Sequence, residues 1–138
     1  MGLIANFFIA DPDTAACLEG TFEMDASDKF EAHRLTELEV GYLYQIAMGR
    51  PTKFDSTLGF SVVNLFDGGE RITTKLPDAF RDLLAVATAE ESNGWAHAWS
   101  KSELGWPKSD CSEVIKGLQC LAKRAQAANK SLFLWNCI

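Results

Sequence analysis

The chain lacks the features that mark membrane and secreted proteins. Its apolar runs fall well short of the roughly 20 residues that a membrane-spanning helix needs, so we expect no membrane segment. The start, MGLIANFFIADPD, has neither a basic n-region nor a small-residue cleavage site, which predicts a cytoplasmic protein without a signal peptide. Repeats, low-complexity tracts and linkers are also absent, and 138 residues suffice for one core. We therefore expect a single domain over residues 1–138.

Cysteine and histidine patterns typical of disulfides or metal sites are also missing. The cysteines are Cys17, Cys111, Cys120 and Cys137, without a CxxC pair, and the chain has only two histidines. Cys111 and Cys120 lie on one predicted helix and are separated by about 900° of rotation, so they face opposite sides. We therefore predict reduced thiols, no metal and no cofactor, which suits the cytosol.

Positive charge is scarce in the first third of the chain. Residues 1–39 hold nine acidic and two basic side chains, whereas residues 40–138 hold ten acidic and eleven basic ones. Because phosphate neutralisation needs a basic surface, we expect no nucleic-acid partner. The acidic third of the chain instead favours the attraction of a basic protein partner. The alternative interpretation is that these charges form a solvated face that binds no partner.

The last 29 residues carry the clearest structural pattern. Apolar residues from Cys111 to Ala125 recur at the spacing of one helical face, which predicts a long amphipathic helix. We expect Asp110 to cap its start and Asn129 to end it in a left-handed conformation. Residues 131–138, SLFLWNCI, are apolar on both faces of a strand, which is typical of a strand at the centre of a sheet.

The remaining elements are predicted from similar patterns. Residues 21–34 have dense charge and weak periodicity, which predicts a loop or a marginal helix. Thr36 and Glu39 predict a capping box at the start of a helix that Gly49 ends. Together these patterns predict an α+β fold with a small mixed sheet, a central C-terminal strand and four or five helices. We expect strands near 3–9, 59–66 and 131–137, with a further strand at 71–75 at an edge of the sheet. We expect helices near 11–20, 36–49, 77–87, 90–101 and 110–129.

Three features make part of the chain resemble a known group of proteins. They are the LPDAF segment after Lys75, the Trp95–Trp99 region, and the terminal LFLWNCI after a basic helix end. Over about residues 76–138 the chain is similar to a group of small bacterial proteins with no assigned activity. This resemblance implies no catalytic residues.

The first candidate site is an acidic surface with an aromatic anchor. Trp95, Trp99 and Trp135 fall on predicted buried faces, so we expect them in the core. Trp106 lies in a Gly-Trp-Pro loop, where we expect an exposed side chain at an interface or a pocket rim. With it, the proposed partner-binding residues are Glu23, Asp25, Asp28, Glu31 and Glu37. This interpretation predicts a non-enzymatic, immunity- or inhibitor-like protein.

The second candidate site is a pocket beside the helix at 90–101. Glu90, Asn93 and His97 share one side of that helix, and such a set can act in general acid–base catalysis. With Trp95 and Trp106 it would form the pocket of a small-molecule-binding domain or an enzyme. The alternative is that these residues form an ordinary solvent-exposed helix surface. The sequence also lacks the catalytic motifs HExxH and GxSxG. We favour the binding protein, and leave monomer and homodimer open.

Overall fold

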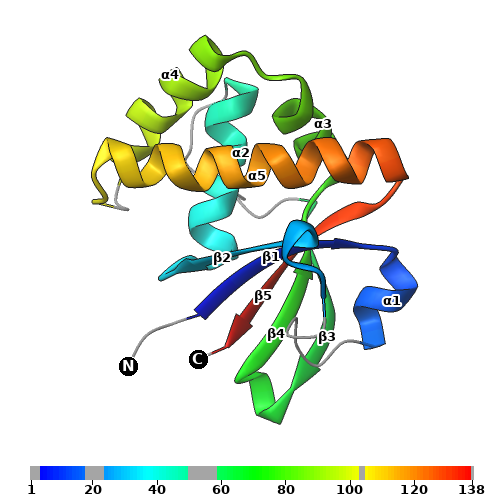
Figure 1. Ribbon diagram of the computed structural model, residues 1–138. Helices are drawn as coiled ribbons and strands as arrows, with labels where there is room; N and C mark the ends of the chain where they lie inside the picture. The colour runs from blue at the N-terminus through cyan, green and yellow to red at the C-terminus, as the bar shows by residue number, and fades with distance from the viewer. Residues whose placement is uncertain (1–3, 18–23, 50–58, 103–104, 138) are drawn as a thin grey trace.

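The structure, a computed structural model, describes residues 4–17, 24–49, 59–102 and 105–137. Within them, five strands form one sheet and five α-helices pack around it (Figure 1), which confirms the α+β class. The strands are β1 (Ile4–Ala10), β2 (Lys29–His33), β3 (Ser61–Phe66), β4 (Arg71–Lys75) and β5 (Ser131–Cys137). The helices are α1 (Pro12–Cys17), α2 (Glu37–Met48), α3 (Asp78–Val86), α4 (Ala89–Ser100) and α5 (Lys108–Ala128), with short 3₁₀ turns η1 (Ala26–Asp28) and η2 (Asp67–Gly69).

The C-terminal strand β5 lies at the centre of the sheet, as its sequence predicts. The strand order is β2-β1-β5-β4-β3, so β1 and β4 flank β5 on its two sides. The strand at 71–75 was predicted at an edge, but β4 lies inside the sheet because β3 pairs with its other side. Leu132, Phe133 and Leu134 are fully buried, although their side chains alternate between the two faces. Both faces of β5 are therefore covered, which explains the continuous apolar sequence.

The sheet is antiparallel throughout the described residues, where a mixed sheet was predicted. All four strand pairs, β1–β2, β1–β5, β3–β4 and β4–β5, run in opposite directions. The connection from β4 to β5 explains the last pair. Helices α3 to α5 return the chain to the end of the sheet where β4 stops, and Leu76 N donates to Leu132 O at 2.9 Å. The sequence pattern does not encode on which end of the sheet such a connection returns.

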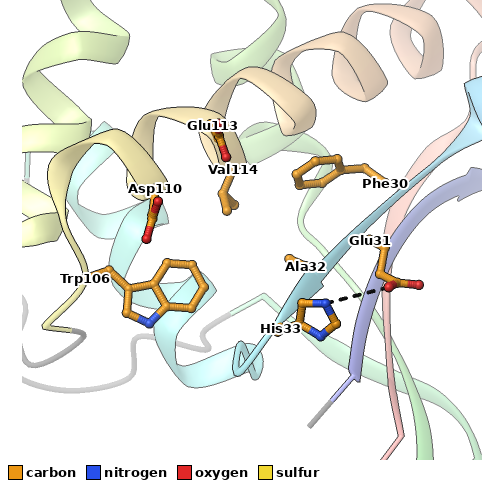
Figure 2. A pocket seen from close by; sticks show the side chains of 8 residues that line it. All are labelled: Phe30, Glu31, Ala32, His33, Trp106, Asp110, Glu113 and Val114. Atoms are coloured by element: carbon orange, nitrogen blue, oxygen red, sulfur yellow. Dashed lines mark ion pairs between the residues drawn. The ribbon is translucent and has the colours of Figure 1, made fainter. Parts of the chain in front are cut away.

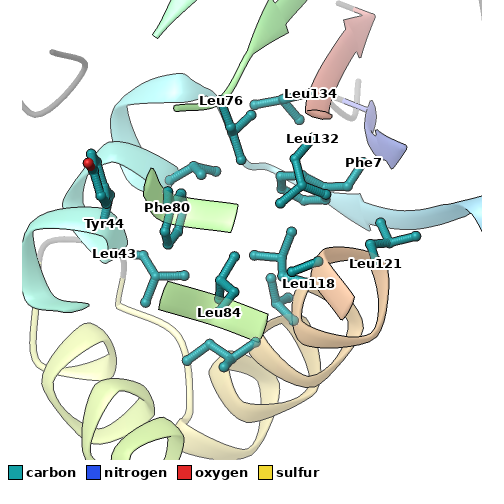
Figure 3. Packing of buried hydrophobic residues seen from close by; sticks show 14 of the residues in the cluster. Phe7, Leu43, Tyr44, Leu76, Phe80, Leu84, Leu118, Leu121, Leu132 and Leu134 are labelled. Carbon is teal, nitrogen blue, oxygen red and sulfur yellow. The ribbon is translucent and has the colours of Figure 1, made fainter. Parts of the chain in front are cut away.

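The main core lies between one face of the sheet and α2, α3, α4 and α5 (Figure 3). Each buried leucine or isoleucine contributes roughly 1.5–3 kcal/mol, more than a surface ion pair, so the apolar face of α5 dictates where this helix lies. Trp95 and Trp99 belong to this core, as predicted.

None of the described helices is both long and apolar enough to span a membrane. The α5 face predicted from the sequence is buried at every position: Cys111, Val114, Ile115, Leu118, Leu121, Ala122 and Ala125.

A smaller core lies on the opposite face of the sheet, under α1. Phe8 and Phe133 stack there with ring centroids 5.3 Å apart, and Ala15 of α1 packs with them. Trp135 is half-buried against this cluster. Helix α1 begins at Pro12, as predicted, and the predicted end at Gly20 lies outside the described residues.

The helix ends agree with the sequence signals, with one exception. Thr36 and Glu39 form the predicted capping box, and Gly49 and Asn129 end α2 and α5 in the left-handed conformation. Asp110 does not cap α5, because that helix begins earlier, after Pro107. The Pro107 carbonyl accepts backbone hydrogen bonds from N–H groups of the next turn. The fixed φ of proline suits a helix start, so the helix begins there and Asp110 lies inside its first turn.

Residues 29–33 form an edge strand, where a loop or marginal helix was predicted. Phe30 and Ala32 point into the main core, while Glu31 and His33 alternate outwards. Phe30 pairs with Phe7 of β1, and their rings stack with centroids 6.3 Å apart. Charges on the outward side obscured this two-residue alternation in the sequence.

Candidate binding groove between β2 and α5

A groove of about 290 Å³ lies between the edge strand β2 and the start of α5 (Figure 2). This volume lies just below the usual range for small-molecule sites in proteins, roughly 300–1,000 Å³. One wall comes from β2, and the other comes from the loop before α5 and the first two turns of that helix. The lining residues are Phe30, Glu31, Ala32, His33, Trp106, Asp110, Glu113 and Val114.

The β2 wall depends on a close approach between the strand and α5. Phe30 and Ala32 face the helix, and the Phe30 ring lies over Gly117 of α5. A Cβ atom at Gly117 would lie 2.7 Å from that ring, so the glycine creates the space that the ring occupies. Glu31 and His33 stand on the other side of the strand, with His33 Nε2 3.7 Å from Glu31 Oε1.

The α5 wall combines an aromatic ring with two carboxylates. Trp106 is half-buried and packs against the main core, where an exposed side chain was predicted. Its position directly before Pro107 and α5 holds it against the core, while it still lines the groove. Asp110 and Glu113 are three residues apart on the exposed side of the helix.

The groove is strongly acidic. Three of its eight lining residues are carboxylates, and none is a lysine or an arginine. Glu31, Asp110 and Glu113 are all exposed, and within the described residues neither Asp110 nor Glu113 forms an ion pair. Glu31 and Trp106 were predicted as binding residues from the sequence, whereas Asp110 and Glu113 were not. Their shared helix face next to Trp106 was the available signal.

The other proposed acidic residues lie apart from the groove. Asp25 is exposed at the start of η1, and Glu37 is half-buried in the first turn of α2. Asp28 Oδ1 lies 2.6 Å from Arg124 Nη2, which fastens η1 to α5. Glu23 lies outside the described residues. Of the described residues in this set, Glu31 and Trp106 line the groove, whereas Asp25, Asp28 and Glu37 do not.

The residues of the second candidate pocket are not brought together with Trp106. Glu90, Asn93 and His97 are exposed on α4, whereas Trp95 of the same helix is buried in the core. None of these four residues lines the groove that Trp106 lines.

The cysteines divide into exposed and buried thiols. Cys17 and Cys120 are exposed, Cys137 is half-buried, and Cys111 is fully buried. Burial raises the pKa of the Cys111 thiol above its ordinary value, and the negative charge of Asp110 raises it further. Cys111 therefore behaves as a core residue and is a poor nucleophile.

No group of three or more histidine, cysteine or carboxylate side chains in the described ranges is placed to hold a metal ion. Asp110 and Glu113 line the groove from α5, whereas the Glu31 side chain stands on the other side of β2, so the three carboxylates do not converge on one point. Such a spread suits a ligand whose positive charges are distributed, as along a peptide.

No protein-family model, curated protein or solved structure matches this chain.

Proposed function

We propose that this protein is a non-enzymatic binding domain whose groove between β2 and α5 receives a basic segment of a partner protein. The observation that carries the proposal is a groove lined by Trp106, Asp110 and Glu113, with no lysine or arginine among its lining residues, beside an edge strand whose other side carries Glu31. We place its action in the cytoplasm, as a small inhibitor- or immunity-like protein that covers a basic surface.

A lysine or arginine side chain has the chemistry that this groove would recognise. Its aliphatic stem packs on aromatic surface, which Phe30 and Trp106 supply, and its charged head stays near carboxylates. A cation over an indole ring gains about 0.5–1 kcal/mol at an exposed site. Charge-assisted hydrogen bonds to the carboxylates add both strength and direction.

The acidic first third of the chain supports the same partner at longer range. Residues 1–39 hold nine acidic and two basic side chains, so this part of the chain carries a net negative charge. The field of such a charge raises the association rate of a basic partner more than it raises the final affinity. Salt should therefore slow association strongly.

The test is a titration with hexalysine at low and at high ionic strength. Tryptophan fluorescence monitors the binding. Hexaglutamate serves as the control peptide. We expect hexalysine to bind at low ionic strength and hexaglutamate not to bind. A failure of hexalysine to bind under any condition would contradict the proposal.

A pair of matched variants separates the groove from general charge. The groove variant carries Glu31→Gln, Asp110→Asn and Glu113→Gln. Three exposed ion pairs at about 0.5 kcal/mol each predict roughly tenfold weaker hexalysine binding. The control variant removes three exposed carboxylates elsewhere, namely Asp13, Glu70 and Glu90, as their amides. Equal weakening in both variants would mean that net charge, not the groove, attracts the peptide.

A further inference from the structure

We infer that the bound segment is extended and adds as a sixth strand to the outer edge of β2, with basic side chains on both of its faces. This inference rests on the proposed function and specifies how the partner is bound. The strand edge supplies the main-chain contacts, and the groove supplies the side-chain contacts, which is the general logic of strand addition.

Within the described part of the chain, no strand pairs with the outer edge of β2. Among the described residues β2 pairs only with β1, and residues 30–33 make no backbone hydrogen bond beyond that ladder. In an antiparallel pair, every second residue directs its N–H and C=O away from the partner strand. On β2 these groups lie along the edge that faces away from β1, and residues of the same strand line the groove.

The two edges of the sheet differ in how they are protected. The β3 edge has a register shift between Val62 and Asn64, and the Asn64 side-chain amide donates to Ala15 O of α1 at 2.8 Å. Bulges and covering elements of this kind discourage strand addition. The register of β2 is regular along its whole length, from Lys29 to His33. The β2 edge is therefore the better template.

Charge selects the strand that this edge accepts. Glu31 is the middle residue of β2, so a symmetric antiparallel pair of two copies would place two Glu31 carboxylates opposite one another. Like charges directly opposite are destabilising in a sheet. A basic strand would be attracted by Glu31, whereas a second copy of this chain would be repelled by it. We therefore assign the edge to a basic partner.

The side chains of the added strand meet acids on both faces of the sheet. Those on the helix side, the side of Phe30, reach toward Trp106, Asp110 and Glu113. Those on the opposite side meet Glu31. Because strand side chains alternate, two adjacent basic residues satisfy both sets of carboxylates at once.

The deciding experiment uses the capped peptide Thr-Lys-Lys-Thr-Thr and two N-methylated forms of it. One form is methylated at its second and fourth amides, and the other at its third and fifth. Methylation removes hydrogen-bond donors and leaves the charge unchanged. We expect one form to bind at least about tenfold more weakly than the parent and the other to bind within about twofold. Amide hydrogen exchange should slow at alternate residues of β2 when the parent peptide binds.

The other outcomes separate this inference from the proposed function. If both methylated forms bind like the parent, the groove recognises basic side chains without strand addition, and the inference fails while the proposed function stands. If neither hexalysine nor the parent peptide binds, both fail. If the free protein sediments as a dimer with β2 amides already protected, a second copy occupies the edge and the inference fails.

A composition-matched isomer tests the two-faced recognition. Thr-Lys-Thr-Lys-Thr has the same charge, but its lysines project from one face of a strand. We expect it to bind about threefold more weakly than Thr-Lys-Lys-Thr-Thr, because it reaches only one set of carboxylates. Equal binding of the two isomers would overturn the assignment of a basic residue to each face.

Discussion

The ring of Phe30 occupies the space that a side chain on Gly117 would fill. A Cβ atom at Gly117 would lie 2.7 Å from the ring atoms Cδ1 and Cε1, closer than real contacts allow. The Phe7 ring stacks with the Phe30 ring, with centroids 6.3 Å apart. This contact brings β2 close to α5, and so it determines the width of the groove between them.

Replacing Gly117 with alanine should therefore destabilise the protein. Overpacking costs about 1–3 kcal/mol, and the gain in helix propensity returns up to about 1 kcal/mol, so we expect a net loss near 1 kcal/mol. Gly94→Ala is the matched control, because Gly94 lies on the exposed side of α4 with no atom near its Cβ position. It should stabilise by about 0.5–1 kcal/mol. Urea unfolding measures the free energy of unfolding of both variants. Equal stabilisation by the two substitutions would show that the Phe30 ring moves aside freely, and would contradict the prediction.

Asp82 should contribute stability that depends on pH. Arg81 Nε donates to Asp82 Oδ1 at 2.9 Å and Gln126 Nε2 donates at 3.2 Å, and these bonds lower the pKa of Asp82 although burial opposes them. A lowered pKa in the folded state means that the stabilisation is present at neutral pH and is lost as the pH falls through that pKa.

Asp82→Asn should accordingly lower the free energy of unfolding at pH 7 by no more than about 1 kcal/mol, because the carboxylate is half exposed. The difference from the parent protein should vanish in strong acid. Glu70→Gln, at an exposed position, should have little effect at either pH. Thermal unfolding across this pH range provides the measurement, and a difference that persists in acid would contradict the prediction.

The cysteines should react with a thiol reagent in a defined order. Cys17 and Cys120 are exposed and should react rapidly in the folded protein. Cys137 is half-buried and should react more slowly. Cys111 is buried with a raised pKa, so it should react only after unfolding. Peptide mapping by mass spectrometry identifies each site, and early modification of Cys111 would show that the start of α5 opens readily.

Trp106 should report binding in the groove. Its fluorescence should change when hexalysine binds, because it is the one tryptophan among the lining residues. Trp106→Ala should weaken binding about threefold, in line with a cation–π contribution of about 0.5–1 kcal/mol. Trp135→Phe is the control, since Trp135 packs against the smaller core on the other face of the sheet. Equal weakening by the two substitutions would argue against a contact between Trp106 and the peptide.

The sequence by itself determined the elements whose signals are local. The apolar face of α5, the capping box of Thr36 and Glu39, and the left-handed ends at Gly49 and Asn129 all depend on residues within one or two turns. The central place of β5 also followed from its sequence, because a strand that is apolar on both sides requires cover on both sides. Local patterns of this kind survive folding when the tertiary contacts agree with them.

Only the tertiary structure decided β2 and the groove. β2 is a strand because β1 offers it a partner, and Phe30 finds room because α5 carries Gly117 at the facing position. Glu31 and Trp106 were singled out from the sequence for separate reasons, but no local pattern indicated that they share a groove with Asp110. The physical reason is that strand pairing and the closing of a groove depend on contacts between segments far apart in the chain. Periodicity within a single segment contains no information about such contacts.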